Sequence, residues 1–402
     1  MSDELEFLAW SRSEESLAAL QAAINLFQVD NRSITVSVNS PVPAMMWTEI
    51  INTALYRQGA DIGEVGASYI TSLRGMDSLR PFTAAEVVAM GGQDAFVKSL
   101  WDSGFDAKSN QLWAIPWRAD TRIIFYRRDL LAKANIKEEG AFATPAQMEQ
   151  TLQTLKDSGI EAPLTLGTAA PQALTTFSTC WVWGAGGDYI SPDGKKVIFD
   201  SPQALAGFRN YFRLGRYLEP STRNLDLAAS DYLFCEGGAA VTYAGTWLQD
   251  LLNRVGSTIV TENLGVALAP GISVVGGTHL VVWKHTRKER QAVDLIRFLT
   301  SKEVVIQHPK LIDIPARLDA LHSNVYAGSK SYEVFTQAIK SGRFAPTTSL
   351  WATIEDRLGK TLSNIWHQLN CAPDADLDKV ISDAIHPLAN RLNATLESLP
   401  PG

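Results

Sequence analysis

The sequence predicts an α/β fold, in which helices flank both faces of a largely parallel sheet, and it predicts more than one such domain. Two observations carry this prediction. Short β-type segments alternate with segments of helical periodicity along the start of the chain, and the alternation returns in its middle. The length of 402 residues is large for a single core but usual for two or three domains.

The start of the chain shows the alternation most clearly. Ser11 and Glu14 have the spacing of a capping box, which begins the first helix. Because the carboxyl ends of parallel strands meet at one edge of a sheet, the loops that begin at Ser11, Asn39 and Gly66 are expected to face the same crevice. Strands are predicted over residues 5–10, 34–38 and 61–65, and helices over about 14–27 and 45–58.

The rest of the chain has clear helix starts. Thr144 and Ser201 each stand before a proline, as N-cap residues often do, and Thr286 with Glu289 again has capping-box spacing. Strands are predicted over 123–126 and 239–243, and several helices are predicted from about residue 331 onward.

The composition excludes some classes of protein. No stretch approaches the ~18 uninterrupted apolar residues that span a bilayer. A net charge of −7, with 36 basic residues spread along the chain, argues against a nucleic-acid-binding surface. The three cysteines, Cys180, Cys235 and Cys371, lack the spacing of a metal site; at least one is left unpaired, and a single disulfide stays possible.

Four segments, in their order and spacing, resemble one known family. They are LWAIPWRADTR at 112–122 with FYRRDLL at 125–131, GAGGD at 184–188 with VIFDSP at 197–202, FCEGGAA at 234–240 with GTW at 245–247, and GG at 276–277 with IPAR at 314–317. Together they resemble the extracellular solute-binding proteins of ABC importers, typified by maltose-binding protein. More narrowly, they resemble members that take up disaccharides and short oligosaccharides.

The resemblance implies a two-lobed periplasmic-binding-protein fold, in which each lobe is a mostly parallel sheet flanked by helices and a three-crossing hinge joins the lobes. Carried onto this chain, the N-terminal lobe comprises residues 1–115 and 271–315, and the C-terminal lobe residues 116–270 and 316–402. The crossings then fall near Pro116, Pro270 and Pro315, where a proline fixes φ and does not extend a strand ladder.

The function that the resemblance implies is that of a substrate-binding subunit of an ABC importer. Such a subunit captures a di- or oligosaccharide by hinge closure and delivers it to the permease subunits in the membrane. The resemblance further implies a monomer without catalytic activity, cofactor, metal or nucleic-acid partner.

The first residues of the chain are relevant to the cellular location of the protein. Met1 to Glu4 lead directly into an apolar segment, without the basic and apolar regions of an exporting signal. Because the resembling family is exported, we expect Met1 to be a replacement start in a protein that works outside the cytoplasm, in the periplasm or lipid-anchored at the cell surface. A cytoplasmic protein is the alternative.

Sugar chemistry guides the choice of candidate site residues, because a pyranose presents an apolar face for stacking and a rim of hydroxyls for hydrogen bonds. Trp247 follows a strand end, where the family stacks an aromatic ring on sugar, and Asp120 aligns with the acidic residue that holds sugar hydroxyls. Core packing and a hinge salt bridge are the respective alternatives. The other candidates of the C-terminal lobe are Trp117, Arg118, Tyr243, Gly245, Thr246, and one of Trp181 and Trp183, which point to different faces of a helix.

The candidates of the N-terminal lobe lie after its strands. Ser68 and Tyr69 match the region where relatives supply a polar residue and an aromatic ring. His279 is either a structural histidine or a ligand contact. The remaining candidates are Trp10, Ser11, Ser40, Trp47 and Glu64.

Three other functions stay open beside sugar capture. A glycosidase also places carboxylates and aromatic rings in a sugar cleft, but the chain carries no hydrolase motif. The same fold could carry a polyamine or a glycerol-phosphate-like solute, whereas six scattered histidines disfavour a metal. An adhesin or sensor module would bind sugar without transport.

Overall fold

The chain forms two units in the computed structural model, which describes residues 3–10, 13–323, 329–346 and 351–397. Unit 1 comprises Met1–Asp120 and Val275–Lys340, and unit 2 comprises Thr121–Val274 and Ser341–Gly402. The chain therefore passes from one unit to the other after Asp120, Val274 and Lys340. The first two passages lie close to residues 115 and 270, the boundaries of the sequence prediction, and the third lies well beyond residue 315.

Local contacts explain why the segment after residue 315 stays in unit 1. The backbone N–H of Ala316 donates to the carbonyl of Trp117 over 3.0 Å. The guanidinium of Arg317 donates to the carbonyls of Met90 and Thr300 over 3.0 and 3.1 Å. These bonds attach the segment to two helix ends of unit 1.

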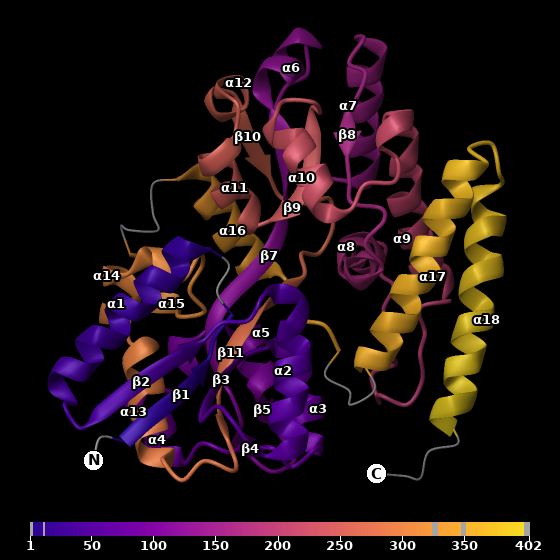
Figure 1. Cartoon of the computed structure of the whole chain (residues 1–402). Coiled ribbons are helices and arrows are strands. Elements are labelled where there is room, and N and C mark those ends of the chain that lie inside the picture. The colour runs from indigo at the N-terminus through magenta and orange to yellow at the C-terminus, as the bar shows by residue number, and fades with distance from the viewer. Residues whose placement is uncertain (1–2, 11–12, 324–328, 347–350, 398–402) are drawn as a thin grey trace. The chain divides into compact units, whose positions relative to one another are not determined.

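The sheet of unit 1 has the strand order β2-β1-β3-β11, with β4 on the far side of β11 (Figure 1). β1 is parallel to β2 and β3, and β11 is antiparallel to β3 and β4. The strands are β1 (Asp3–Leu8), β2 (Ile34–Asn39), β3 (Ile62–Gly66), β4 (Leu79–Arg80) and β11 (Val275–Trp283), and a separate hairpin pairs β5 (Phe105–Asp106) with β6 (Gln111–Leu112).

Helices cover both faces of this sheet. Alternate residues of β11 point to opposite faces: Leu280 and Val282 pack with α1 and α13, whereas Val281 and Trp283 pack with α2 and α3. The helices of unit 1 are α1 (Glu14–Asp30), α2 (Pro43–Tyr56), α3 (Ile70–Gly75), α4 (Ala84–Ala89), α5 (Lys98–Gly104), α13 (Glu289–Leu299), α14 (Lys302–Gln307), α15 (Leu318–Leu321) and α16 (Lys330–Ser341).

The sheet of unit 2 has the strand order β10-β7-β9-β8. β9 is parallel to β8, whereas β7 is antiparallel to both β9 and β10. The strands are β7 (Ile115–Arg127), β8 (Leu164–Thr165), β9 (Val241–Gly245) and β10 (Leu264–Ala267).

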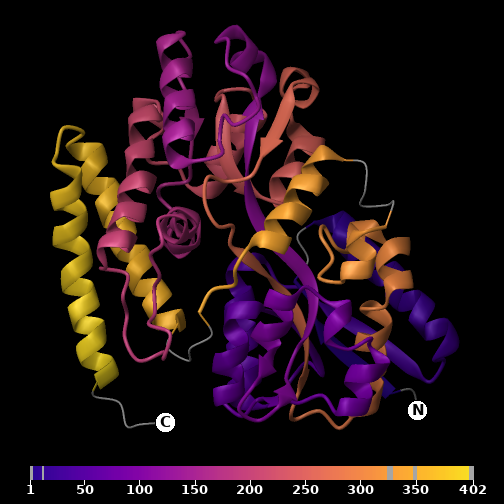
Figure 2. The ribbon, with the colours of Figure 1, turned by 180° about the vertical axis from the view of Figure 1, so that it is seen from behind.

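A large aromatic core fills unit 2 beside this sheet. Trp181 packs against both Tyr211 and Tyr243, and Trp366 of α17 packs on Tyr211. Figures 1 and 2 both show α17 and α18 lying beside α8 and α9. The helices of unit 2 are α6 (Arg128–Lys133), α7 (Pro145–Asp157), α8 (Pro171–Gly184), α9 (Pro202–Arg213), α10 (Leu227–Cys235), α11 (Trp247–Val255), α12 (Thr258–Glu262), α17 (Trp351–Cys371) and α18 (Leu377–Glu397). The cysteines Cys180, Cys235 and Cys371 are free thiols.

The α/β class predicted from the sequence is confirmed, but the sheets are mixed rather than mostly parallel. In unit 1, β11 runs against its neighbours, and in unit 2, β7 does so. Both strands lie where the chain enters a unit, β11 from Val275 and β7 through Thr121. Two successive strands are parallel when a crossover helix connects them. A strand that enters from another unit has no such helix before it, so it can run antiparallel to its neighbours.

Two predicted helix caps are wrong by a few residues, and two are confirmed. Ser13, rather than Ser11, is the N-cap of α1 and accepts from the N–H of Ser16. Lys288, rather than Thr286, is the N-cap of α13. Thr144 and Ser201 cap α7 and α9 as predicted, each accepting from a backbone N–H three residues ahead.

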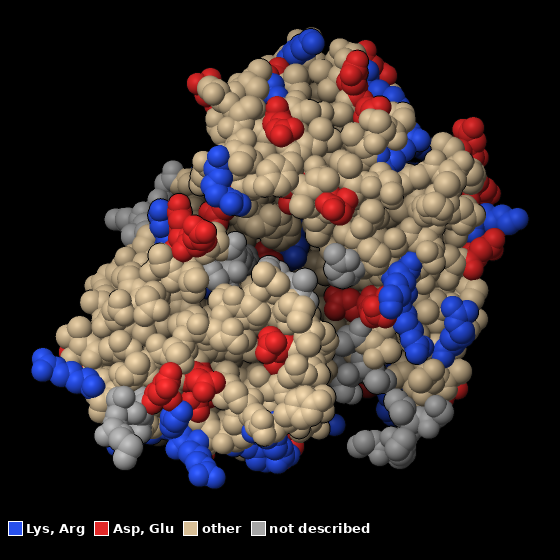
Figure 3. Space-filling view, viewed as in Figure 1, with Lys and Arg blue, Asp and Glu red and all other residues tan. Residues whose placement is uncertain are grey.

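Surface charge is dispersed on the face that Figure 3 displays, where small groups of acidic and basic side chains are scattered among uncharged ones. Neither of the two helices of 21 residues, α17 and α18, nor any other helix in the described ranges has the apolar content of a membrane span.

Candidate functional site

Trp247 is the first residue of α11, separated from the end of β9 by Thr246 alone, and its side chain is half-buried. Its indole Nε1 donates to Oδ2 of Asp231 over 2.7 Å. The ring lies against the backbone of Gly245, where a Cβ would come within 2.0 Å of an indole carbon. A glycine at this strand end is therefore what lets the indole occupy its place.

A cation holds the same ring from another direction. The guanidinium carbon of Arg122, in β7, lies 5.3 Å from the ring centroid of Trp247 and 5.9 Å from that of Phe177 in α8. Cation–π contacts at these distances are attractive. The indole of Trp247 is thus oriented by a hydrogen bond and by a cation before any ligand arrives.

Two carboxyl groups around this cluster hold their protons to unusually high pH. Burial raises the pKa of Asp231 to about 6, although the hydrogen bond from Trp247 lowers it. Burial also raises the pKa of Glu355 to about 7, against the lowering effects of the Thr176 hydroxyl, 3.5 Å away, and the charge of Arg122. A carboxyl group that titrates near neutrality can donate as well as accept, which suits a ligand rich in hydroxyls.

In unit 1, the buried carboxylate of Glu64 joins three strands at one point. It accepts from the backbone N–H of Trp10 over 2.8 Å and from the hydroxyl of Thr278 over 2.6 Å. Nε of Arg118 lies 3.1 Å from the same carboxylate as an ion pair without hydrogen-bond alignment. Because these contacts use both carboxylate oxygens, Glu64 serves to position its neighbours.

An aromatic pair stands at the carboxyl end of β3. The ring centroids of Trp47 and Tyr69 are 4.2 Å apart with a 36° tilt between the planes. Trp47 is 40% exposed, and Tyr69 is half-buried across the backbone of Gly66. Trp10, Ser40 and Ser68, also predicted for the site, are half-buried after β1, β2 and β3. Together they form a polar and aromatic face at one edge of the sheet.

The three candidates of β7 that lie in unit 1 are buried. Trp117 packs on Phe7, with ring centroids 6.1 Å apart, and the guanidinium carbon of Arg118 lies 4.6 Å from the Trp117 ring. Asp120 is 8% exposed and is the last residue before the chain passes into unit 2. β11 approaches this strand closely at Gly277 (φ +151°), where a Cβ would come within 2.0 Å of the Arg118 carbonyl oxygen.

Three other candidates occupy packed positions. Tyr243 and Trp181 contact each other edge to face, 5.1 Å apart, in the core of unit 2. Trp183 donates to Asp188 over 3.1 Å, and the Arg343 guanidinium covers its ring.

His279 is fully buried in unit 1. Its Nε2 lies 2.9 Å from the carbonyl oxygen of Leu100, and burial lowers its pKa to about 4, so the ring is neutral and structural in this conformation.

The structure therefore brings Trp247, Gly245 and the buried Thr246 together in unit 2, and Trp10, Glu64, Ser68, Tyr69 and Trp47 near one sheet edge in unit 1. Ser11 lies outside the described residues. Sequence reasoning did not include Asp231, Glu355 or Arg122 among the candidate site residues. Asp231 and Glu355 lie in helices without a motif, so only the packing of those helices reveals their contacts.

Comparisons with known proteins agree with this architecture. The family model described as "Bacterial extracellular solute-binding protein" matches residues 14–306. A probable ABC transporter-binding protein of Deinococcus radiodurans is 26% identical over 255 residues, which are 57% of this chain and 58% of that protein. The diacetylchitobiose binding protein DasA of Streptomyces coelicolor is 22% identical over 63% of this chain and 59% of its own. The chain thus spans less than two thirds of both relatives.

Solved structures share the fold over nearly the whole chain. The GacH receptor of Streptomyces glaucescens, solved without ligand and with acarbose, has a TM-score of 0.82 at 16% identity and 100% coverage of both chains. Maltose-bound MalE3 of T. maritima has a TM-score of 0.82 at 18% identity, covering 98% of this chain and 100% of its own. Lmo0181 of Listeria monocytogenes, solved with cycloalternan, has a TM-score of 0.80 at 15% identity and covers 99% of this chain and 100% of its own.

Proposed function

Since the chain belongs to the family of bacterial extracellular solute-binding proteins, we propose that it is the ligand-capturing subunit of an ABC importer and that its ligand is a di- or oligosaccharide. In this role the protein binds its ligand without changing it. Its partners are the permease subunits of the importer, and it works outside the cytoplasm.

The main support for a sugar ligand is the Trp247 indole, whose orientation is fixed before a ligand binds. A sugar ring buries its apolar face on such an indole, while nearby polar groups bind its hydroxyls. Asp231 and Arg122 hold the indole in one orientation, so little conformational entropy is lost when a sugar stacks on it. The half-protonated carboxyl of Glu355 supplies a group that can both donate and accept.

The second half of the proposed site is the face of unit 1 formed by Trp10, Ser40, Ser68, Tyr69 and Trp47. The rings of Trp47 and Tyr69 offer a further stacking surface. Glu64 anchors the loop that carries Trp10. We propose that a ligand contacts both faces and favours a closed form, with the change absorbed where the chain passes between the units.

The names of related proteins support a carbohydrate ligand. DasA is named for diacetylchitobiose, and the solved structures with this fold include complexes with acarbose, maltose and cycloalternan. These ligands share linked pyranose-like rings that carry many hydroxyls, which is the chemistry that the Trp247 cluster fits.

A thermal-shift screen against neutral mono- to tetrasaccharides tests the proposal. A sugar present at 100 times its dissociation constant is expected to stabilise the protein by about 2.7 kcal/mol. The screen should include spermidine and glycerol 3-phosphate as alternative cargoes. Stabilisation by one of these, with no response to any sugar, would replace the sugar assignment.

A further inference from the structure

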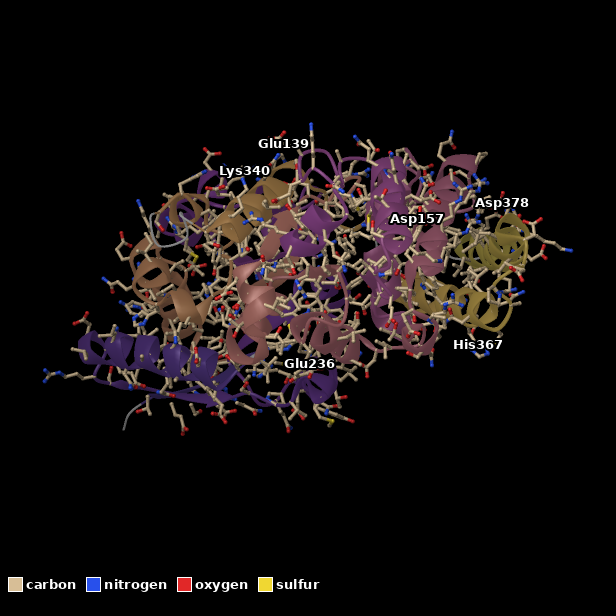
Figure 4. All side chains as sticks on the ribbon, turned by 90° about the horizontal axis from the view of Figure 1, so that it is seen from above. Glu139, Asp157, Glu236, Lys340, His367 and Asp378 are labelled. Atoms are coloured by element: carbon tan, nitrogen blue, oxygen red, sulfur yellow. The ribbon has the colours of Figure 1, made fainter. Side chains whose placement is uncertain are left out.

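A cavity of about 470 Å³ lies in unit 2 where three helices end. Its lining includes Lys156 from the last turn of α7, Arg213 from the end of α9, and residues from the end of α17. Figure 4 looks down on this side of unit 2 and labels Asp157, the last residue of α7, together with His367 of α17 and Asp378 of α18. None of the residues in the proposed sugar site lines this cavity.

The lining is strongly basic. Lys156, Arg213, Arg216 and Arg223 contribute four positive charges, and Asp374 contributes the single carboxylate. The whole chain carries a net charge of −7, so this concentration of cations runs against the overall balance. A concave surface lined by one sign of charge attracts ligands of the opposite sign.

The ends of the helices explain only part of this charge. Exposed carbonyls at a helix carboxyl end attract basic side chains. Accordingly, Nζ of Lys156 donates to the carbonyl of Arg216 over 3.0 Å. Arg213 lies 4.0 Å from the carboxylate of Glu149 as a loose ion pair. These two cations therefore have partners within the protein.

Arg216 and Arg223 differ in this respect. Among the residues that the structure describes, neither guanidinium has a hydrogen-bond or ion-pair partner, and Nε of Arg223 is buried without an acceptor. The backbone of Arg223 is nevertheless fixed, since its carbonyl accepts from the Thr168 hydroxyl over 2.5 Å and from the Asn370 amide over 2.7 Å. A buried N–H without an acceptor is unfavourable, and an oxyanion in the cavity would satisfy it.

The floor of the cavity is apolar. It is formed by Phe212 and Trp366, both almost fully buried, and by Leu369 and Leu377. Gly215 allows the indole of Trp366 to approach, because a Cβ there would come within 2.8 Å of the ring. The cavity thus combines an apolar floor with two guanidinium groups that lack partners among the described residues.

We propose that this cavity binds a small organic anion, in which a phosphate or carboxylate group is attached to an apolar or aromatic carrier. The oxyanion pairs with the guanidinium groups of Arg216 and Arg223, whose planar forks match two oxygens at once. The carrier lies on Leu369 and Leu377, the half-buried apolar side chains of the lining. This site is separate from the proposed sugar site and does not depend on it.

Titration calorimetry and thermal shift with four probes test the proposal: phenyl phosphate, benzoate, inorganic phosphate and uncharged phenol. At least one of phenyl phosphate and benzoate is expected to bind more tightly than inorganic phosphate and than phenol, and the stronger of the two identifies the oxyanion. Arg216→Gln and Arg223→Gln should each weaken that binding about tenfold or more, as expected for a lost charge-assisted hydrogen bond.

Arg391→Gln is the matched control, because it removes one positive charge from α18 at a position that does not line the cavity. It should leave the affinity for the probes unchanged, and so should Trp247→Ala. The proposal is overturned if neither organic anion binds, if phenol binds as tightly, or if Arg391→Gln weakens binding as much as the two cavity variants. Arg216 is exposed, so its variant stays informative even if Arg223→Gln destabilises the fold.

Discussion

The indole Nε1 of Trp247 donates a 2.7 Å hydrogen bond to Oδ2 of Asp231, and this bond connects the first residue of α11 to the middle of α10. The donor is the only polar group of the indole, so the bond leaves both faces of the ring to apolar and cation–π contacts. It determines how the proposed stacking surface of unit 2 is held.

Replacing Trp247 by Ala should lower affinity for the sugar by roughly 30-fold or more. The substitution removes an aromatic anchor, and the loss of such an anchor costs about 2 kcal/mol or more. Stability without ligand should change much less than the ~3–5 kcal/mol lost when a buried large side chain is truncated, because Trp247 is only half-buried. Calorimetry and urea unfolding measure the two effects.

Two variants serve as controls for this result. Trp247→Phe keeps a stacking face and should retain most of the binding. Gly245→Ala keeps the indole but displaces it, because a Cβ would come within 2.0 Å of the ring, and should therefore weaken binding. Early melting of Trp247→Ala together with normal sugar affinity would show that the residue is packing.

Asp231 should make stability depend on pH in a defined window. Its pKa is raised from the ordinary value of 3.8 to about 6 in the folded protein, so the folded state holds the proton more tightly than the unfolded state. Stabilisation from that proton is complete below pH 4 and is lost as the pH rises through 6. The loss amounts to about 3 kcal/mol at most.

Asp231→Asn keeps a hydrogen-bond acceptor for the indole but cannot ionise. The difference in unfolding free energy between wild type and this variant should therefore change between about pH 4 and pH 6 and stay constant above pH 7. Urea unfolding at several pH values gives the difference directly. A difference that is the same at every pH would show that the carboxyl titrates normally.

The place of Trp247 beside a strand end could be predicted from the sequence, whereas its contact with Asp231 could not, and the reason is physical. A tryptophan directly after a Gly-Thr pair at a strand end is visible in the chain, and its contact with sugar stays a prediction. Asp231 lies within a helix of nine residues and reaches Trp247 only because α10 packs on α11. A contact between helices depends on packing distances that no local spacing encodes.

Strand direction, like contacts between helices, could not be predicted from local sequence patterns. Alternation of strands and helices correctly predicted the α/β class, because it follows from apolar periodicity. It did not predict that β7 and β11 run against their neighbours, since direction depends on where the chain enters each unit. Aromatic composition likewise did not distinguish Trp47, which is 40% exposed, from Trp117 and Trp181, which are buried.

Glu64→Ala should destabilise unit 1 by roughly 3–5 kcal/mol. The substitution leaves the buried guanidinium of Arg118 without its counter-charge and removes the acceptor for the Trp10 N–H and the Thr278 hydroxyl. Urea unfolding of the ligand-free protein measures the effect.

Asp102→Ala is the matched control in the same unit. Its ion pair with Lys98 is exposed, with side-chain exposures of 74% for Lys98 and 49% for Asp102. Removing an exposed pair should cost about 1 kcal/mol or less. Equal losses of unfolding free energy in Glu64→Ala and Asp102→Ala would contradict the structural role of Glu64.

Ligand binding should also make the molecule more compact. If sugar contacts residues of both units, the ligand shifts the population toward a closed form by its higher affinity for that form. Small-angle scattering should then give a smaller radius of gyration at saturating sugar than without it. An unchanged radius at demonstrated saturation would argue that one unit alone holds the ligand.

The proposed function requires that this protein captures a sugar and releases it unchanged. Its most direct test is a calorimetric titration of the wild-type protein with the sugar that gives the largest thermal shift, followed by chromatography of the recovered ligand. We expect saturable binding of one sugar per protein and recovery of the intact sugar. Binding by no sugar of the panel, or recovery of a cleaved or otherwise modified sugar, would contradict the claim.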